Sequence, residues 1–290
     1  MTTSTSQNTH ETDTANNASY TTISTILTLA IPTFGQLIAE PAFVLIDTAI
    51  VGHIGGQALA GLSVGSTIVL TVVGLCVFLA YSTTTQVGRL LGAGKRGEGL
   101  EAGIDGLWLA GIIGVVVSVA LFVIARPLCT AMGAQGSVLH NAVDYVRAVV
   151  FGIPGMLLVY AANGIFRGLQ KVRITLIAAM VGAILNTLLD LLFILGFGWG
   201  VFGSGVATLI SQWFMAVALI VPSVLWTRAE GARLQPRVEQ CWRWCGVVFA
   251  YACVACMPGG ECGAGHAYGC GSVGCISGGE FQLEFCAEHA

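Results

Sequence analysis

Residues 25–51 read TILTLAIPTFGQLIAEPAFVLIDTAIV, an apolar stretch that contains Pro32, Pro41 and two acids, Glu40 and Asp47. A helix needs about 20 mostly apolar residues to cross the hydrocarbon core of a bilayer, so this stretch is long enough to span one. A carboxylate at that depth costs on the order of 2.5–3.5 kcal/mol by insertion scales, and by default it indicates a function. Glu40 and Asp47 are separated by two helical turns and therefore share one helix face. That face is the first candidate for a functional site.

The composition of the whole chain is that of an integral membrane protein. Of its 290 residues, 55% are hydrophobic and 9% are charged, whereas roughly 25% of the residues of a soluble domain are charged. Several apolar runs exceed about 18 residues, which favours membrane helices over a β-barrel. No window gathers enough Lys and Arg to neutralise a run of phosphates, so we expect no binding to nucleic acid.

Six apolar segments follow one another and predict an all-α, polytopic membrane protein built as a six-helix bundle. The segments are approximately residues 24–51, 58–82, 105–126, 143–165, 174–196 and 203–226. Small residues recur within them, for example Gly61 with Gly65 and Gly111 with Gly114. Such residues allow membrane helices to approach one another closely, so we expect them at helix contacts.

The basic residues predict how these helices are oriented. Only two, Arg126 and Arg147, lie on one side of the predicted bundle, whereas nine follow the second, fourth and sixth segments. The nine are Arg89, Lys95, Arg96, Arg167, Lys171, Arg173, Arg228, Arg233 and Arg237. Lys and Arg concentrate in cytoplasmic loops. We therefore expect a multi-pass protein of the plasma (inner, cytoplasmic) membrane, with both ends of the six-helix unit in the cytoplasm.

Polar residues inside the apolar segments define a candidate cation site. Asn186 and Asp190 are four residues apart on one predicted helix and point the same way. An amide beside a carboxylate can stabilise the ionised group or hold a cation through hydrogen bonds. Asn163 and Thr208 would complete a polar cluster with Asp47 if their helices face inward.

Two of the acids also have a structural interpretation. Asp47 could be a helix-end residue in the headgroup zone, and Glu40 precedes Pro41, where a kink frees carbonyls and admits water. Glu40 is for this reason only a secondary candidate. Carboxylates that repel one another in a low-dielectric interior favour uptake of a proton or another cation. The pattern thus predicts a cation switch in a transporter rather than the active site of an enzyme.

Five groups of motifs within residues 25–237 carry a family resemblance. They are Glu40-Pro41, residues 44–55 (VLIDTAIVGHIG) with 58–61 (ALAG), residues 86–89 (QVGR) with 92–94 (GAG), residues 163–168 (NGIFRG) and residues 186–190 (NTLLD). Together they resemble the multidrug and toxic compound extrusion (MATE) transporters, most closely their DinF-like branch. The resemblance implies two six-helix lobes, related as parallel repeats by an axis along the membrane normal.

The resemblance also implies a function and a set of site residues. MATE transporters export amphiphilic, often cationic, xenobiotic compounds in exchange for protons or Na⁺, so the coupling ion is the only cofactor that we expect. The polar cavity of the family's amino-terminal lobe falls here on Asp47, Asn163, Asn186, Asp190 and Thr208. The proline that bends the first helix of the family falls on Pro32.

The two ends of the chain differ from this membrane unit in composition. Residues 1–22 are polar without Lys or Arg, and we expect them to form a disordered leader. Eight of the ten Cys residues lie between Cys241 and Cys286. We therefore divide the chain into a leader (1–22), a six-helix lobe (23–237) and a Cys/Gly-rich tail (238–290).

The composition of the tail has three interpretations. A zinc site would use Cys253 and Cys256, but no second CxxC couple is present, as a structural zinc module normally requires. Disulfides are disfavoured in a cytoplasmic segment. A shifted reading frame is the interpretation that we favour. With free choice of codons, the frame beginning one nucleotide later allows residues 265–290 to encode a segment similar to the start of a second lobe.

On this interpretation the chain is the amino-terminal lobe of a cation-coupled antiporter, which is inactive alone because it lacks the second lobe. Its partners would then be a small amphiphilic or cationic substrate, the lipid bilayer and the missing lobe. Two alternatives stay open. One is a non-transporting membrane module whose Cys-rich tail binds a metal or a partner, and the other is a half-size transporter that self-associates.

Overall fold

A computed structural model of the protein describes Phe34, Gly35, Ile38 and residues 45–235. Residues 45–52 form the end of a first helix. The elements that follow are α2 (Gly56–Leu75), α3 (Phe78–Gly92), α4 (Arg96–Ala131), α5 (Gly136–Val150), α6 (Ile153–Gly168), α7 (Val172–Asp190), the π-helix η1 (Leu191–Gly196) and α8 (Gly200–Ala229). No β-strand occurs within these described ranges. The predicted all-α architecture is confirmed.

Five of the six predicted apolar segments correspond to described helices. The helical stretches that are long and apolar enough to cross a membrane are Gly56–Gly92, Arg96–Ala131, Val172–Gly196 and Gly200–Ala229, with the bent pair α5 and α6 as a fifth. Most of the first segment lies outside the described residues, together with Pro32, Glu40 and Pro41. The proposed leader and Cys-rich tail also lie outside them, so the domain boundaries stay predictions.

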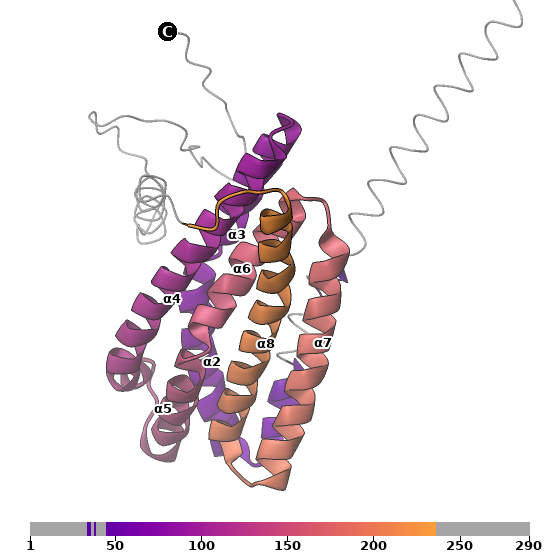
Figure 1. Ribbon diagram of the computed structural model, residues 1–290. Coiled ribbons are helices and arrows are strands. Elements are labelled where there is room, and N and C mark those ends of the chain that lie inside the picture. Colours follow the sequence, from indigo (N-terminus) through magenta and orange to yellow (C-terminus); the bar gives the residue numbers. More distant parts are fainter. Residues whose placement is uncertain (1–33, 36–37, 39–44, 236–290) are drawn as a thin grey trace, which may run out of the picture. The chain divides into compact units, whose positions relative to one another are not determined.

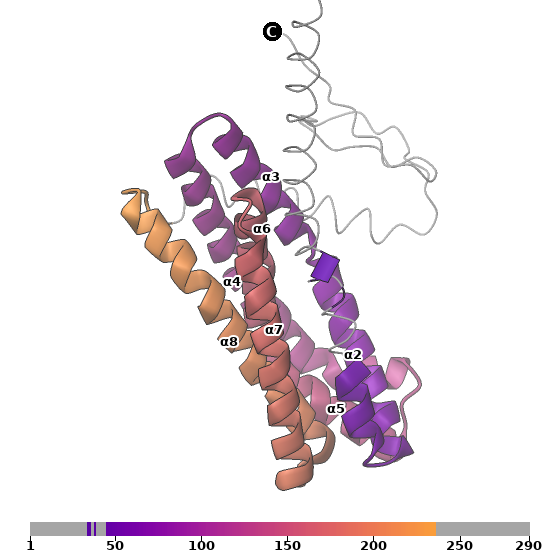
Figure 2. The ribbon, with the colours of Figure 1, turned by 90° about the vertical axis from the view of Figure 1, so that its right-hand side faces the viewer.

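Helix α6 lies at the centre of the bundle (Figures 1 and 2). It packs against α3, α4 and α8 and also contacts α2 and α7. Its side chains Ile153, Leu157 and Phe166 are completely buried. By contrast, α4 and α7 expose bulky apolar side chains, including Ile112, Val116, Val119, Val123, Ile177, Ile184 and Leu188. An apolar exterior of this kind is what a helix requires against lipid.

The fourth predicted segment is a broken span rather than one straight helix. Helices α5 and α6 meet at a bend of 52°. At the break, backbone carbonyls lose the backbone N–H groups that would bind them in a continuous helix. Two side chains from neighbouring helices bind these carbonyls. Ser118 Oγ of α4 donates to the Val150 carbonyl at 2.7 Å, and Trp213 Nε1 of α8 donates to the Phe151 carbonyl at 2.9 Å. Irregular backbone at membrane depth is tolerated where the protein satisfies it in this way.

Small residues set the distance between α2 and α5. A Cβ atom on Gly61 would lie 2.5 Å from Asn141 Cβ, and one on Gly65 would lie 2.7 Å from the Tyr145 ring. Real Cβ contacts are not this short, so both positions require glycine where the helices touch. The predicted role of this glycine pair at a helix contact agrees with the structure, and it fixes where Tyr145 enters the bundle.

The basic turns share one end of the bundle. Arg96, at the start of α4, lies 3.0 Å from Glu230, just after α8. Lys171, in the α6–α7 turn, lies 3.8 Å from the centroid of the Trp226 ring near the end of α8. The cations that follow the second, fourth and sixth segments are therefore brought to one side, as the alternation of helix directions requires.

Candidate functional site

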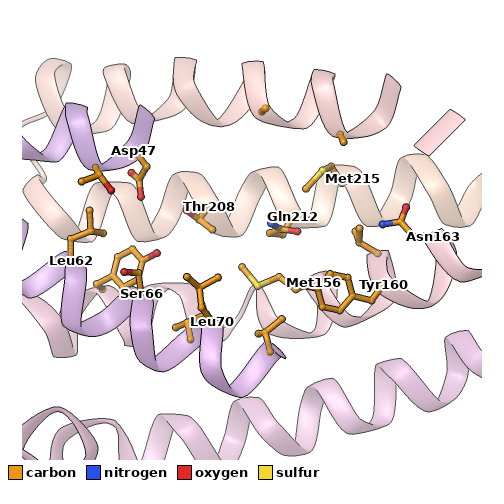
Figure 3. Close-up of a pocket in the computed structure, with 17 residues that line it drawn as sticks. Asp47, Leu62, Ser66, Leu70, Met156, Tyr160, Asn163, Thr208, Gln212 and Met215 are labelled. Atoms are coloured by element: carbon orange, nitrogen blue, oxygen red, sulfur yellow. The ribbon is translucent and has the colours of Figure 1, made fainter. Parts of the chain in front are cut away.

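A cavity of about 170 Å³ lies between the first helix, α2, α5, α6, α7 and α8. Figure 3 shows it running along α8. Asp47 is the one charged side chain among the described residues that line it. The other lining residues are neutral polar groups and apolar side chains, among them Ser66, Tyr145, Tyr160, Asn163, Thr208, Gln212, Leu62, Leu70, Met156 and Met215. The cavity is thus mostly apolar with an acid at one end.

Asp47 is bound by a serine that the sequence analysis did not single out. Ser204 Oγ of α8 donates to Asp47 Oδ1 at 2.7 Å. Ser204 is completely buried and Asp47 is 6% exposed. The hydrogen bond joins residues 157 positions apart and holds the first helix against α8. A carboxylate at this depth needs such a partner, because burying it without one is costly.

Asp190 lies in a second set of hydrogen bonds that meets the first on α8. In the amide orientation that pairs donors with acceptors, Asn186 Nδ2 donates to Asp190 Oδ2 at 2.8 Å. In the same orientation Asn186 Oδ1 accepts from the Thr208 backbone N–H at 3.2 Å. Tyr145 of α5 forms a side-chain hydrogen bond with Thr208. Asp190 and Asn186 are 0% and 1% exposed, so this polar group is sealed inside the bundle.

The two carboxylates form one electrostatic unit. Asp47 and Asp190 lie close enough to interact by charge, and Tyr145 interacts with both. Asp190 Oδ1 is buried without a hydrogen-bond donor among the described residues. The arrangement gathers carboxylate, amide and hydroxyl oxygens, and no basic side chain is among the described residues that line the cavity. Such a set of hard oxygen atoms suits a proton or a small cation.

The predicted site residues fall into two groups. Asp47, Asn186, Asp190 and Thr208 come together, whereas Asn163 lies at the opposite end of the cavity from Asp47 (Figure 3). Asn163 therefore lines the same cavity but does not join the acid cluster. Pro32 and Glu40 lie outside the described residues.

Two residues of the cluster, Ser204 and Tyr145, were missed by the sequence analysis. Ser204 lies one helical turn before Thr208 in a mostly apolar segment, and this i, i+4 pair of hydroxyls was the available signal. Tyr145 lies in a helix whose sequence gives no sign that the ring faces a polar site.

The backbone changes where Asp190 ends α7. The π-helix η1 begins at the next residue, Leu191, and continues to Gly196. π-Helical turns are rare and often occur at functional sites. The wider turn shifts the residues after Asp190 around the helix axis relative to a regular α-helix. Asp190 consequently sits at a junction between two helix geometries.

Comparison with known proteins places this bundle among transporters. The family model described as MatE matches residues 32–192. A solved structure of a MATE protein in its bent conformation is 23% identical with a TM-score of 0.68, over 79% of this chain and 52% of that one. An outward-facing multidrug resistance MATE transporter of the MOP superfamily gives 25% identity and a TM-score of 0.67, over 74% and 49% of the two chains. A MOP superfamily transporter from Pyrococcus furiosus is 25% identical with a TM-score of 0.65, over 74% of this chain and 47% of that one. The chain spans about half the length of these solved structures.

Proposed function

We propose that this chain, which belongs to the MatE family of multi-pass membrane transporters, takes part in the export of amphiphilic or cationic compounds in exchange for protons or Na⁺. The observation that carries the proposal is the pair of buried acids, Asp47 and Asp190. They come from different helices and interact by charge, and Asp47 lies at one end of a cavity whose other described lining residues are neutral. Ionisable residues inside a membrane bundle are costly, and they typically mark ion pathways.

In this proposal, cation and substrate compete for the same negative charge. A proton or Na⁺ bound at Asp47 and Asp190 neutralises the end of the cavity and weakens its attraction for a cationic substrate. Release of the cation restores that attraction. An exchange of this kind is a coupling free energy between two ligands, and it must act equally in both directions. Asn186 and Thr208 would orient Asp190, and Ser204 would orient Asp47, through the hydrogen bonds described above.

The first helix is the element that such an exchange would move. The hydrogen bond between Asp47 and Ser204 connects this helix to α8. A change in the charge of Asp47 alters the strength of that bond, because hydrogen bonds to an ionised acceptor are stronger. We propose that cation loading changes how firmly residues 45–52 are held against α8, with a bend at Pro32 accommodating the movement.

The orientation of the proposed transporter follows from its charge distribution. Arg96, Lys171 and the end of α8 lie at one end of the bundle, and that end would face the cytoplasm of a cell whose plasma membrane holds the protein. We also propose that it belongs to the DinF-like branch of the family.

Transport by the whole protein would involve a second six-helix unit. The chain spans about half of the solved structures that it matches, and alternating access in such folds rests on movement of one repeat against the other. The second unit would be a second lobe or a second copy of this chain. Crosslinking of the purified chain in bilayers distinguishes these, because a transport-competent dimer would favour self-association.

The proposed exchange is tested by export assays with matched acid variants. Cells or proteoliposomes carrying the full chain are compared with Asp47→Asn, Asp190→Asn and the control Asp144→Asn. Asp144 is also an acid, but it is paired at 3.2 Å with the exposed His140. Because the chain is predicted to be inactive without a second six-helix unit, it is assayed together with such a unit, and we expect cation-driven efflux that both buried-acid variants abolish and the control retains. Efflux that is indifferent to Asp47 and Asp190 would contradict the proposed function.

A further inference from the structure

We propose that Gly182 and Met215 together set the size of the group that the cavity accepts. Because Gly182 has no side chain, the Met215 side chain can pack against it and leave the cavity open. This inference rests on the proposed function, because it assumes that the cavity binds substrate. It adds which residues limit the substrate and what kind of group fits.

The packing of these two residues is tight and specific. Met215 of α8 lines the cavity, whereas Gly182 of α7 lies behind it and is buried. A Cβ atom built on Gly182 would lie 2.5 Å from both Cγ and Sδ of Met215. Ordinary contacts begin at 3.4 Å, so any side chain at position 182 would force the Met215 thioether to move. The open space that Met215 borders is the cavity itself.

The volume of the cavity indicates what fits when Met215 is retracted. At about 170 Å³ it is close to a dry engineered cavity of roughly 150 Å³ that accepts benzene. Sites for drug-sized ligands begin at about 300 Å³. The described cavity therefore accommodates one ring-sized group, and displacement of a single Met side chain into it would exclude that group.

The two ends of the cavity fit opposite ends of one ligand. Thr208, beside the acid cluster, and Met215 are seven residues apart on α8, which corresponds to about 10 Å along a helix. Figure 3 shows Asp47 at one end and Met215 with Met156 toward the other. A cation with one attached ring would place its charge near Asp47 and its ring between the two methionines. Met side chains are flexible and pack well against aromatic rings.

The test compares two cationic probes that differ by one ring. Trimethylphenylammonium carries the ring, and tetramethylammonium lacks it and serves as an internal control for folding and for the acid end. Binding of both to the purified full chain is measured by equilibrium dialysis. The variants are Gly182→Ala, Met215→Ala, the double variant and Gly111→Ala. Gly111 is the matched control because its nearest neighbour to an added Cβ is the tip of Leu158 at 3.9 Å.

We expect Gly182→Ala to lower the affinity ratio of the ring probe to the ringless probe by about tenfold or more, because the added Cβ displaces the Met215 thioether, which borders the cavity. The double variant should restore the ratio, and Gly111→Ala should leave it unchanged. If Gly182→Ala does not fold, Met215→Phe takes its place and should lower the ratio in the same way. A ratio for Gly182→Ala, or for Met215→Phe in its place, that stays within about threefold of wild type would overturn the inference even if both probes bind. Failure of the wild-type chain to bind either probe in an Asp47-dependent way would overturn the proposed function as well.

Discussion

Replacing Ser204 with Ala removes the hydroxyl that holds Asp47, and the expected cost can be worked out from the structure. The lost hydrogen bond between Ser204 and Asp47 is 2.7 Å long. Both side chains are buried, so water cannot replace the missing hydroxyl. An unsatisfied buried partner costs about 1–3 kcal/mol in general, whereas hydrogen bonds between membrane helices average about 0.6 and reach about 1.7 kcal/mol. Because the acceptor is a carboxyl group, we expect a loss near the upper membrane value, about 1.5 kcal/mol.

Ser211→Ala is the matched control for this prediction. Ser211 is on the same helix and is equally buried, but its hydroxyl has no hydrogen-bond partner among the residues that the structure describes. Its removal should change stability by less than about 0.5 kcal/mol or increase it. Equilibrium unfolding of the purified chain in mixed micelles, titrated with sodium dodecyl sulfate, measures both variants. Equal losses for Ser204→Ala and Ser211→Ala would refute the reasoning, because they would show that the contact with Asp47 contributes nothing.

The same unfolding titration tests three further contacts. Gly61→Ala should destabilise the chain by about 2 kcal/mol or more, because the added Cβ meets the α5 backbone and side chains; a loss below that of an average surface variant would be inconsistent with the packing. Trp213→Phe should cost about 1 kcal/mol, because the Phe151 carbonyl at the α5–α6 break loses its donor, and an unchanged midpoint would mean that another group satisfies it. Arg96→Glu or Glu230→Arg alone should each destabilise the chain by at most about 0.5 kcal/mol, because the ion pair is exposed. The double variant, which reverses the pair, should restore most of that stability. Strictly additive losses would exclude a pairwise attraction.

The acid cluster could be predicted in part because charge is rare inside apolar segments. Asp47 and Asp190 stand out against their neighbours, and helical spacing connects Asn186 to Asp190. The residue pattern of a single segment does not predict which other helices it contacts. For that reason Ser204, whose only signal is its spacing from Thr208, acquires its meaning from the contact with Asp47. Asn163 was predicted with the cluster, but the path of α6 places it at the far end of the cavity.

The fold could be predicted at the level of spans but not of their interruptions. Five of the six predicted apolar segments fall within the five spans found among the described residues, counting the bent pair as one. The bend between α5 and α6 was not predicted, because apolar residues continue through it. Gly152 and Pro154, which lie at the bend, were the only local signal. A break of this kind is stable only because Ser118 and Trp213 bind the freed carbonyls. Those partners come from other helices, so no local pattern reveals them.

The most direct test of the central claim measures how tightly the purified chain binds trimethylphenylammonium as a function of pH and of Na⁺ concentration. If Asp47 and Asp190 exchange a coupling cation for substrate, probe affinity must fall as the proton or Na⁺ concentration rises, by linkage. Asp47→Asn should remove that dependence, and Asp144→Asn should leave it intact. Probe binding that is independent of both cations in the wild-type chain would contradict the account.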